Sequence, residues 1–416
     1  MNKIILASAA FLTSLAAIAQ NHTGTLPIRS AREDSGTISL LSNKNDIEAV
    51  LDSIESNNLS LKALSKEMKA NQLLNKTGIA LPDPEVQFDY LWGEPAEIGG
   101  RRDFNISQSI DFATVSGTRR KLADAQDGLL EIGFRASRMA LLLEAEQICI
   151  DLTYCNALIS EIGSRLRSAT ILTQGYEKQL AEGNTSKLEV NKIRLSLSGI
   201  QGELSRTRVE KDHLISRLTN LNGGKPMTFD ILEYPGSELP EDFDSWSADA
   251  AKASPAIAYV RQNALVGEKK LALSKMSSYP ELSAGYMSEL VPGNNFRGIS
   301  VCLSIPLWSN RNNVRQAKAA LAAAQFRQQD ETVRFYGKLR SVYERACGLK
   351  QIAISYKESL KSLDNSEMLK KALDKGEISL LDYIMETNLY YDAVKGSLAA
   401  ERDYESAMAE LQAAML

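Results

Sequence analysis

The sequence contains few of the residues that catalytic and metal sites usually need. Only two histidines occur in 416 residues, too few for a histidine-based metal site or a histidine-dependent catalytic triad. The four cysteines form no CxxC pair and no cluster; they are Cys149, Cys155, Cys302 and Cys347. Phosphate-binding, dinucleotide-binding and nucleophile-elbow motifs are also missing. We therefore expect no enzymatic activity, no cofactor and no metal site.

Long hydrophobic runs, aromatic residues and strong net charge are scarce as well. After residue 20 no apolar run reaches about 18 residues, so the sequence predicts no transmembrane helix there. Aromatic residues make up 6% of the chain, which is low for thick globular cores, and the abundant Ala, Leu, Glu, Lys and Ser suit long packed helices. A net charge of -4 gives no nucleic-acid-binding footprint, so we expect no nucleic-acid partner.

The N-terminus has the pattern of a secretory signal. Lys3 provides the positive end, residues 4–18 are largely apolar, and Ala17-Ile18-Ala19 forms a small-x-small cleavage site. An uncleaved membrane anchor is the alternative, for which the apolar run is short. No cysteine follows the site, so a lipid anchor there is not encoded. We predict a signal peptide at residues 1–19 and a loose, polar leader at 20–44.

Two parts of the chain, about 195 residues apart, have the same order of motifs. Each has a helix, two short alternating strands, a long helix, a glycine turn and a returning helix. The turns align as Leu180-Ala181-Glu182-Gly183 and Leu373-Asp374-Lys375-Gly376. A period of this length indicates a duplicated domain-sized unit rather than a short solenoid repeat. We assign residues 45–221 to the first repeat, 222–246 to an irregular linker and 247–416 to the second repeat.

The helices are predicted from apolar spacing and from the absence of proline. Between residues 118 and 181 no proline occurs, and apolar residues recur at alternating spacings of three and four, the heptad pattern of a coiled coil. The second copy has a similar seam from Leu339 to Leu363. We expect each long helix to contain roughly 64 residues and to extend about 95 Å. Shorter helices are expected at 46–74, 187–220, 247–274 and 379–416.

The predicted strand pairs, at 85–112 and 281–307, alternate apolar and polar residues. The side chains expected to face lipid are Val86, Phe88, Tyr90, Val301 and Leu303. Runs of about 9 to 11 residues match the length needed to cross hydrocarbon at a tilt. A half-buried sheet on a soluble core would show the same alternation, so the strands alone leave both interpretations open.

Four strands per chain cannot span a membrane by themselves, because open sheet edges cannot exist in lipid. Closing a barrel needs at least about eight strands, and three chains would supply twelve. The same trimer would bring its long helices into a hollow bundle that continues the barrel. This combination favours the membrane interpretation of the strands.

In this order the motifs resemble those of the TolC-like outer-membrane efflux protein family. The strand starts match at Pro82-Asp83-Pro84-Glu85 and Tyr279-Pro280-Glu281, and the last strand ends at Ile305-Pro306-Leu307. The first copy departs from the pattern at 112–115, where no proline occurs. The resemblance covers residues 38–416. It implies a mainly α fold with a membrane β-barrel, in which long coiled-coil α-helical hairpins and four β-strands per chain form a trimeric 12-stranded barrel continuing into a helical tunnel.

The resemblance also implies a passive exit duct of a tripartite efflux or type I secretion system, located in the outer membrane with its helical tunnel in the periplasm. Its homotrimer would meet outer-membrane lipid, a periplasmic adaptor (membrane fusion) protein and an inner-membrane efflux pump, and would export small molecules or metal ions. The adaptor would dock at the helical turns, through Gly183, Thr185, Ser186, Gly376, Ile378 and Ser379. Nearby carboxylates could ring a pore constriction, namely Glu182, Asp374, Glu377 and Asp382. An ordinary solvated helix face is the alternative for each carboxylate.

A periplasmic coiled-coil adaptor is the second interpretation, since it also has a signal and long hairpins. That class predicts a single hairpin, a Gly/Val-rich lipoyl-like β-domain and often a lipidated cysteine, and the sequence has none of these features. A secreted helical enzyme, the third class, would need a convergent set of polar residues that is also missing.

Overall fold

The computed structural model describes residues 45–308, 310–363 and 365–414. The chain divides into two units, residues 1–41 and 42–416, and every described residue belongs to the second. The predicted signal peptide and leader lie outside the described residues. None of the described helices has the length and hydropathy of a membrane-spanning helix.

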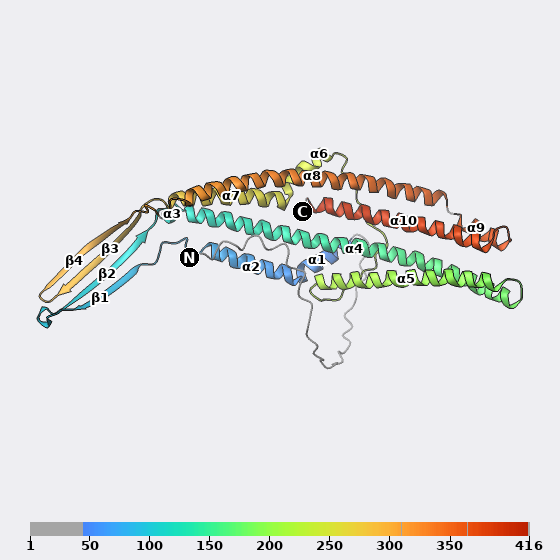
Figure 1. Ribbon diagram of the computed structural model, residues 1–416, viewed down its shortest axis with the longest axis horizontal. Coiled ribbons are helices and arrows are strands. Elements are labelled where there is room, and N and C mark those ends of the chain that lie inside the picture. The colour runs from blue at the N-terminus through green and yellow to red at the C-terminus, as the bar shows by residue number, and fades with distance from the viewer. Residues whose placement is uncertain (1–44, 309, 364, 415–416) are drawn as a thin grey trace, which may run out of the picture. The chain divides into compact units, whose positions relative to one another are not determined.

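Four antiparallel strands form one sheet at one end of the described unit (Figure 1). They are β1 (Glu85–Trp92), β2 (Gly100–Ile110), β3 (Glu281–Val291) and β4 (Asn294–Ser304). Their spatial order is β1-β2-β3-β4, and the pairing of β2 with β3 joins the two predicted strand pairs into a single sheet. β1 and β4 are therefore the edge strands.

The second and fourth strands begin and end earlier than the sequence pattern predicts. β2 ends because Asp111 caps the short helix α3 (Phe112–Val115), its carboxylate accepting the N–H of Thr114 at 2.5 Å. β4 ends two residues before Pro306, which lacks the N–H that strand pairing uses. The expectation that the following residues lie on strands is therefore wrong; they are Phe112, Ile305 and Leu307.

The first helical hairpin follows the prediction closely. α4 (Thr118–Ala181) has 64 residues and begins and ends where the sequence pattern predicts. The chain then returns as α5 (Lys187–Leu221), which packs against α4 along the described unit (Figure 1).

The second long helix is broken, and the expectation of one continuous rod is wrong. Its parts are α8 (Asn313–Ser362) and α9 (Ser366–Asp374), followed by the returning helix α10 (Leu380–Ala413). Asn365 and Ser366 lie at the break, and such short polar residues compete for backbone hydrogen bonds and favour helix ends. The apolar seam also loses its cover here, because Tyr356 and Leu363 are exposed whereas Leu339 is buried.

Two shorter predicted helices are likewise divided, each into a pair. The pairs are α1 (Asn45–Asn57) with α2 (Leu59–Asn75), and α6 (Phe243–Ala253) with α7 (Pro255–Met276). Asn58 separates the first pair because its side chain accepts the N–H of Leu61 at 2.9 Å and so caps α2. Pro255 starts α7 because a residue without an N–H suits the first helical position.

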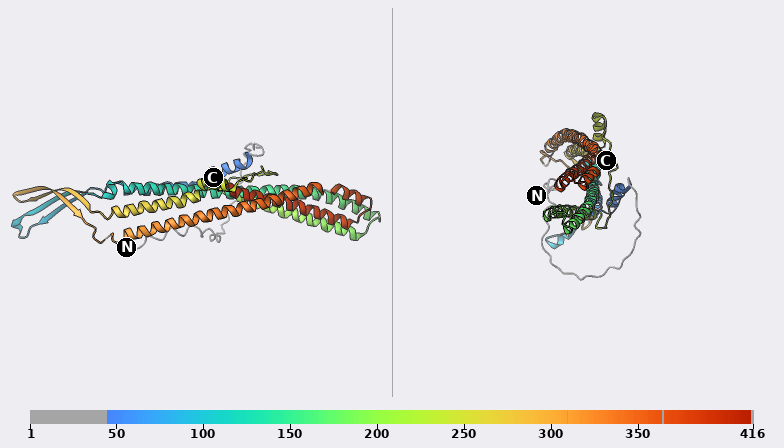
Figure 2. Two further views of the ribbon diagram at one scale, coloured as in Figure 1. Left: turned by 90° about the horizontal axis from the view of Figure 1, so that it is seen from above. Right: turned by 90° about the vertical axis from the view of Figure 1, so that its right-hand side faces the viewer.

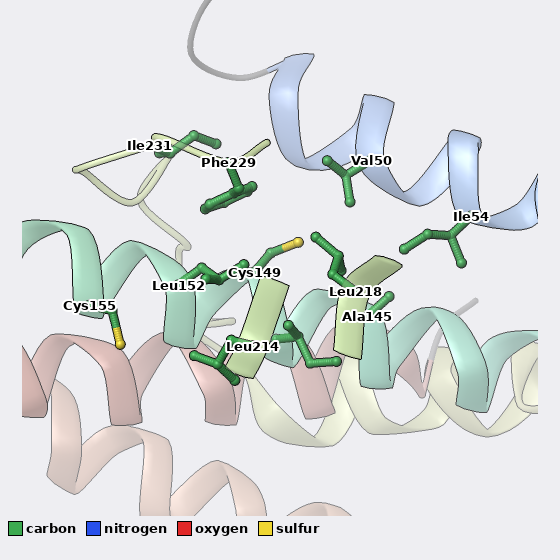
Figure 3. Packing of buried hydrophobic residues seen from close by; sticks show 11 residues of the cluster. Val50, Ile54, Ala145, Cys149, Leu152, Cys155, Leu214, Leu218, Phe229 and Ile231 are labelled. Atoms are coloured by element: carbon green, nitrogen blue, oxygen red, sulfur yellow. The ribbon is translucent and has the colours of Figure 1, made fainter. Parts of the chain in front are cut away.

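The largest buried cluster lies where α1, α4, α5 and the linker after α5 meet (Figure 3). Ile54, Leu152 and Leu218 are completely buried there, and Phe229 of the linker packs against them. Asn156 of α4 fixes the linker by donating to the carbonyls of Phe229 and Ile231 at 3.1 and 3.0 Å.

The linker also contacts helices of the second repeat. Tyr404 of α10 donates to the carbonyl of Ser237 at 2.7 Å, and the Ser237 hydroxyl donates to Glu405 at the same distance. Tyr343 of α8 donates to the carbonyl of Pro240 at 2.8 Å. The helices of both repeats lie side by side within the described unit (Figure 2), and the linker ties them together.

Candidate functional site

The sheet has one apolar and one polar face. Directly paired residues on neighbouring antiparallel strands point to the same side, so the row Val86, Ile106, Tyr286 and Ile299 lies on one face. Alternate residues along each strand return to that face. The register therefore gathers all five residues predicted to face lipid on this side; they are Val86, Phe88, Tyr90, Val301 and Leu303.

The opposite face is mainly polar. Its side chains include Glu85, Gln87, Asp89, Asp103, Asn105, Ser107, Glu289 and Ser300. Arg101 lies 2.9 Å from Asp103 and 3.1 Å from Glu289, so one cation serves two carboxylates. Such a face favours contact with water.

The apolar face is uncovered in the single chain. Ile299 is 83% exposed, Val301 69% and Phe88 64%. Folded soluble monomers rarely leave so much contiguous apolar surface in water, and a patch of this kind marks a membrane or protein interface.

Aromatic side chains lie near both ends of the sheet. At one end the ring centroids of Tyr90 and Trp92 are 5.4 Å apart, and the Arg102 guanidinium lies 5.7 Å from the Tyr90 ring. At the other end the rings of Phe112 and Tyr279 are 6.2 Å apart. Aromatic girdles at both interfaces are typical of membrane β-proteins.

Asp111 ties the sheet to the first long helix. Its buried carboxylate caps α3 and also accepts a hydrogen bond from Arg119 Nη2 of α4 at 3.1 Å. Because Asp111 directly follows β2, its side chain links the end of this strand to both α3 and α4. Sequence reasoning missed this role, although an Asp before a short helical run is a cap signal that could have identified it.

The two helical turns are built in the same way. Gly183 and Gly376 have φ of 76° and 73°, the left-handed conformation that glycine adopts without strain. After each, a backbone N–H closes on the preceding helix, Asn184 to Gln179 O at 2.8 Å and Glu377 to Ala372 O at 2.9 Å. Both turns are therefore Schellman motifs. They lie at the end of the described unit opposite the sheet (Figure 1).

Serine side chains start both returning helices. The Ser186 hydroxyl accepts the N–H of Glu189 at 3.3 Å. Ser379 and Asp382 form a complete capping box, with bonds of 3.2 Å in both directions. Asp382, one of the predicted constriction carboxylates, thus has a structural role at the start of α10.

The other predicted residues of the turns differ in exposure. Thr185 and Ile378, at equivalent positions, are half-buried, and the Thr185 hydroxyl donates to Glu189. The remaining carboxylates are exposed, with Glu182 4.0 Å from Lys178 and Glu377 3.9 Å from Lys375. The exposed groups common to both turns are the glycines, the capping serines and acidic side chains; they are Gly183, Ser186, Glu182, Gly376, Ser379, Asp374 and Glu377.

Polar contacts between the two hairpins could not be predicted from the sequence. Arg165 of α4 donates to Asn388 of α10 at 2.5 Å, and Lys395 of α10 donates to Glu203 of α5 at 2.7 Å. Each joins residues about 200 positions apart, with separations of 223 and 192. No local periodicity can reveal such pairs.

The described residues offer no arrangement of three His, Cys, Asp or Glu side chains suited to a metal ion. All four cysteines are free thiols. Burial raises the pKa of Cys149 to about 12 and that of Cys155 to about 11, so both stay protonated and pack as small apolar groups.

By sequence, the chain matches no protein-family model and no curated protein. By structure it is similar to the Campylobacter jejuni CmeC outer membrane channel, with 16% identity, 94% of each chain covered and a TM-score of 0.74. It is also similar to the outer-membrane channel OprN, with 15% identity, 89% of this chain and 90% of that chain covered, and a TM-score of 0.75.

A third similar structure is the open state of the Neisseria gonorrhoeae MtrE outer membrane channel, with 14% identity, coverages of 89% and 88%, and a TM-score of 0.62. At identities this low, the structural similarity establishes the fold alone. The TolC-like fold expected from the sequence, with long helical hairpins and four strands per chain, is confirmed.

Proposed function

We propose that this chain, which has the fold of outer-membrane channels, forms a homotrimeric exit duct in the outer membrane. The duct belongs to a tripartite efflux system and exports small molecules or metal ions passively. The observation that carries the proposal is the two-faced sheet, whose apolar side is uncovered in the single chain.

The sheet supports a barrel because its edges need partners. In lipid every backbone N–H and C=O must be hydrogen-bonded within protein, and β1 and β4 each have one unpaired edge in the described chain. Joining β4 of one copy to β1 of the next satisfies both edges. Three copies would close about twelve strands, enough for a water-filled lumen, with the apolar face towards lipid and the polar face inside.

The helical turns support docking at the opposite end. Two compact glycine turns per chain, with a small exposed surface at Gly183 and Gly376, would meet a periplasmic adaptor protein that links the duct to an inner-membrane pump. The predicted signal peptide is consistent with this periplasmic placement. A coiled-coil adaptor, the alternative, is less well supported because the chain has two helical hairpins and an apolar sheet face without a cover.

The assembly is tested by native mass measurement of the full chain purified in detergent. We expect a trimer, because three copies bring the barrel above the minimum of about eight strands. Reconstituted into planar bilayers, the same preparation should conduct ions. A stable, water-soluble monomer without conductance would overturn the proposal.

A further inference from the structure

A groove lies between the two helical hairpins, close to the end at which they turn. Residues of α4, α5, α8, α9 and α10 line it together with Leu363 and Asn365, and its volume is about 900 Å³. Small-molecule sites have volumes of roughly 300–1,000 Å³. α10 contacts α4 directly, so the side chains of one copy build this groove. Figure 1 shows the helices that surround it.

Aromatic side chains are concentrated in the groove. Its four tyrosines are Tyr176, Tyr383, Tyr390 and Tyr391, in a chain with 6% aromatic residues. The rings of Tyr390 and Tyr391 meet edge to face at 5.7 Å. The Arg165 guanidinium already lies 4.9 Å from the centre of the Tyr391 ring. The groove thus already holds one cation against an aromatic ring. The negative surface of the ring attracts the cation.

The groove has an excess of negative charge. Its lining includes four carboxylates and two cations; these are Glu161, Glu367, Asp374, Glu386, Arg165 and Lys370. The Arg165 charge is already engaged, at 2.5 Å from Asn388 and 3.7 Å from Glu203, and Glu367 pairs with Lys371 at 3.6 Å. Among the described residues, the groove carboxylates without such a partner are Glu161, Asp374 and Glu386, against the single cation Lys370. Burial raises the pKa of Tyr176, and the charges of Glu189 and Asp374 add to this effect.

Free space adjoins this aromatic wall. Gly175 lines the groove next to Tyr176, and a Cβ built on Gly175 would meet no atom within 4 Å. Leu172 and Leu373 add apolar surface. A ligand that fits must therefore be apolar and flat over most of its surface and positively charged.

We propose that this groove binds a lipophilic aromatic cation, with its rings against the tyrosines and its charge near the carboxylates. An apolar helix of a second copy or of a partner protein would leave the excess negative charge uncompensated, whereas a small cation neutralises it. The site goes beyond the proposed duct, and its ligand is recognised whether or not the assembled protein conducts.

The test is a fluorescence-anisotropy titration of the purified full chain in detergent with ethidium, a planar aromatic cation. Fluorescein, a planar aromatic anion, serves as the charge control. We expect ethidium to bind and fluorescein not to bind. Tyr383→Ala should weaken ethidium binding roughly five- to thirtyfold, the range for loss of a desolvated cation–π contact, whereas Tyr383→Phe keeps the ring and should stay within about twofold.

Gly175→Leu should abolish binding by filling the space. The matched control is Gly202→Leu on α5, where a Cβ also meets nothing within 4 Å but which does not line the groove. Native mass and thermal melting verify that both variants assemble. The proposal is overturned if the assembled protein does not bind ethidium, if both dyes bind equally, or if the two glycine variants behave alike. Conductance is measured separately, so failure here leaves the duct proposal to its own test.

Discussion

Single residues distinguish the two faces of the sheet. Val301 and Ser300 are neighbours on β4, yet they point to opposite faces because strand side chains alternate. Val301 pairs with Ala284 on the apolar face, and Ser300 pairs with Gly285 on the polar face. Ser300 is partly exposed on this face, so a longer polar side chain there can extend into water.

Val301→Arg should therefore hinder membrane insertion, at a cost of roughly 2–4 kcal/mol if the residue lies near the bilayer midplane. Ser300→Arg, with the same charge and size change one residue away, should be tolerated much better. The measurement is the amount of heat-modifiable trimer recovered in membrane fractions. Equal effects of the two substitutions would show that the face assignment is wrong.

A second residue-scale feature is the ion pair that fastens α1 to α4. Arg138 Nε and Nη2 donate to the two carboxylate oxygens of Glu55 at 2.6 and 2.5 Å. These hydrogen bonds lower the pKa of Glu55 below its ordinary value of 4.5. A carboxylate with a depressed folded-state pKa contributes stability above the unfolded pKa and loses it as pH falls through the folded one.

We therefore expect hydrogen exchange of the α1 amides to accelerate as the pH falls below about 4.5, after correction for intrinsic exchange. The change is small, on the order of 0.5 kcal/mol, because solvent screens this partly exposed pair. In Glu55→Gln the pH dependence should be absent. An identical profile in both proteins would contradict the role of Glu55.

At the scale of elements, the turns combine a backbone requirement with an open surface. A Cβ on Gly376 would meet nothing within 4 Å, so only the positive φ opposes substitution. That strain costs on the order of 1 kcal/mol for a residue with a Cβ and more for a β-branched one. The sheet lies at the far end of the described unit and does not depend on this turn (Figure 1).

Gly376→Val should thus give a folded, membrane-inserted trimer that no longer supports export with its adaptor and pump. Gly376→Asn is the matched control for backbone strain, because Asn tolerates the left-handed conformation. Export is measured as substrate accumulation in cells. Normal export by Gly376→Val, with adaptor crosslinks mapping elsewhere, would reduce Gly376 to a turn residue without a docking role.

At the scale of the whole molecule, three-fold symmetry would multiply every group near the turns. Asp374 and Glu377 are exposed and lie next to Gly376, so a trimer would arrange them in rings if they face the pore. Rings of carboxylates attract cations through their summed charge. Asp382 is less suitable for this test, since its removal also breaks the capping box of α10.

Replacing Asp374 and Glu377 with Ala should weaken block of the single-channel current by divalent cations. Asp330→Ala removes a carboxylate on α8 that pairs with Arg334 at 3.0 Å, far along the chain from the turns, and should leave the block unchanged. Unaltered block in the double variant would place these carboxylates on a solvated outer surface.

The types of the elements and their order could be predicted from the sequence alone, because these follow from local periodicity and turn chemistry. α4 begins and ends where its uninterrupted heptad pattern does, and Gly183 and Gly376 were recognisable as turn residues because a left-handed helix end needs glycine. Alternation along β1 and β4 was enough to sort Val86 and Val301 from their polar neighbours.

Features that depend on contacts between distant segments follow from the packing of the whole chain and could not be predicted in the same way. The joining of β2 to β3 and the contacts of Arg165 with Asn388 and of Tyr404 with Ser237 each bring together segments far apart in the sequence. The groove between the hairpins also depends on segments far apart in the sequence, because it exists only where α4 and α10 come together. Local periodicity reports which side of an element is apolar, whereas the partner that covers this side is chosen by the packing of the whole chain.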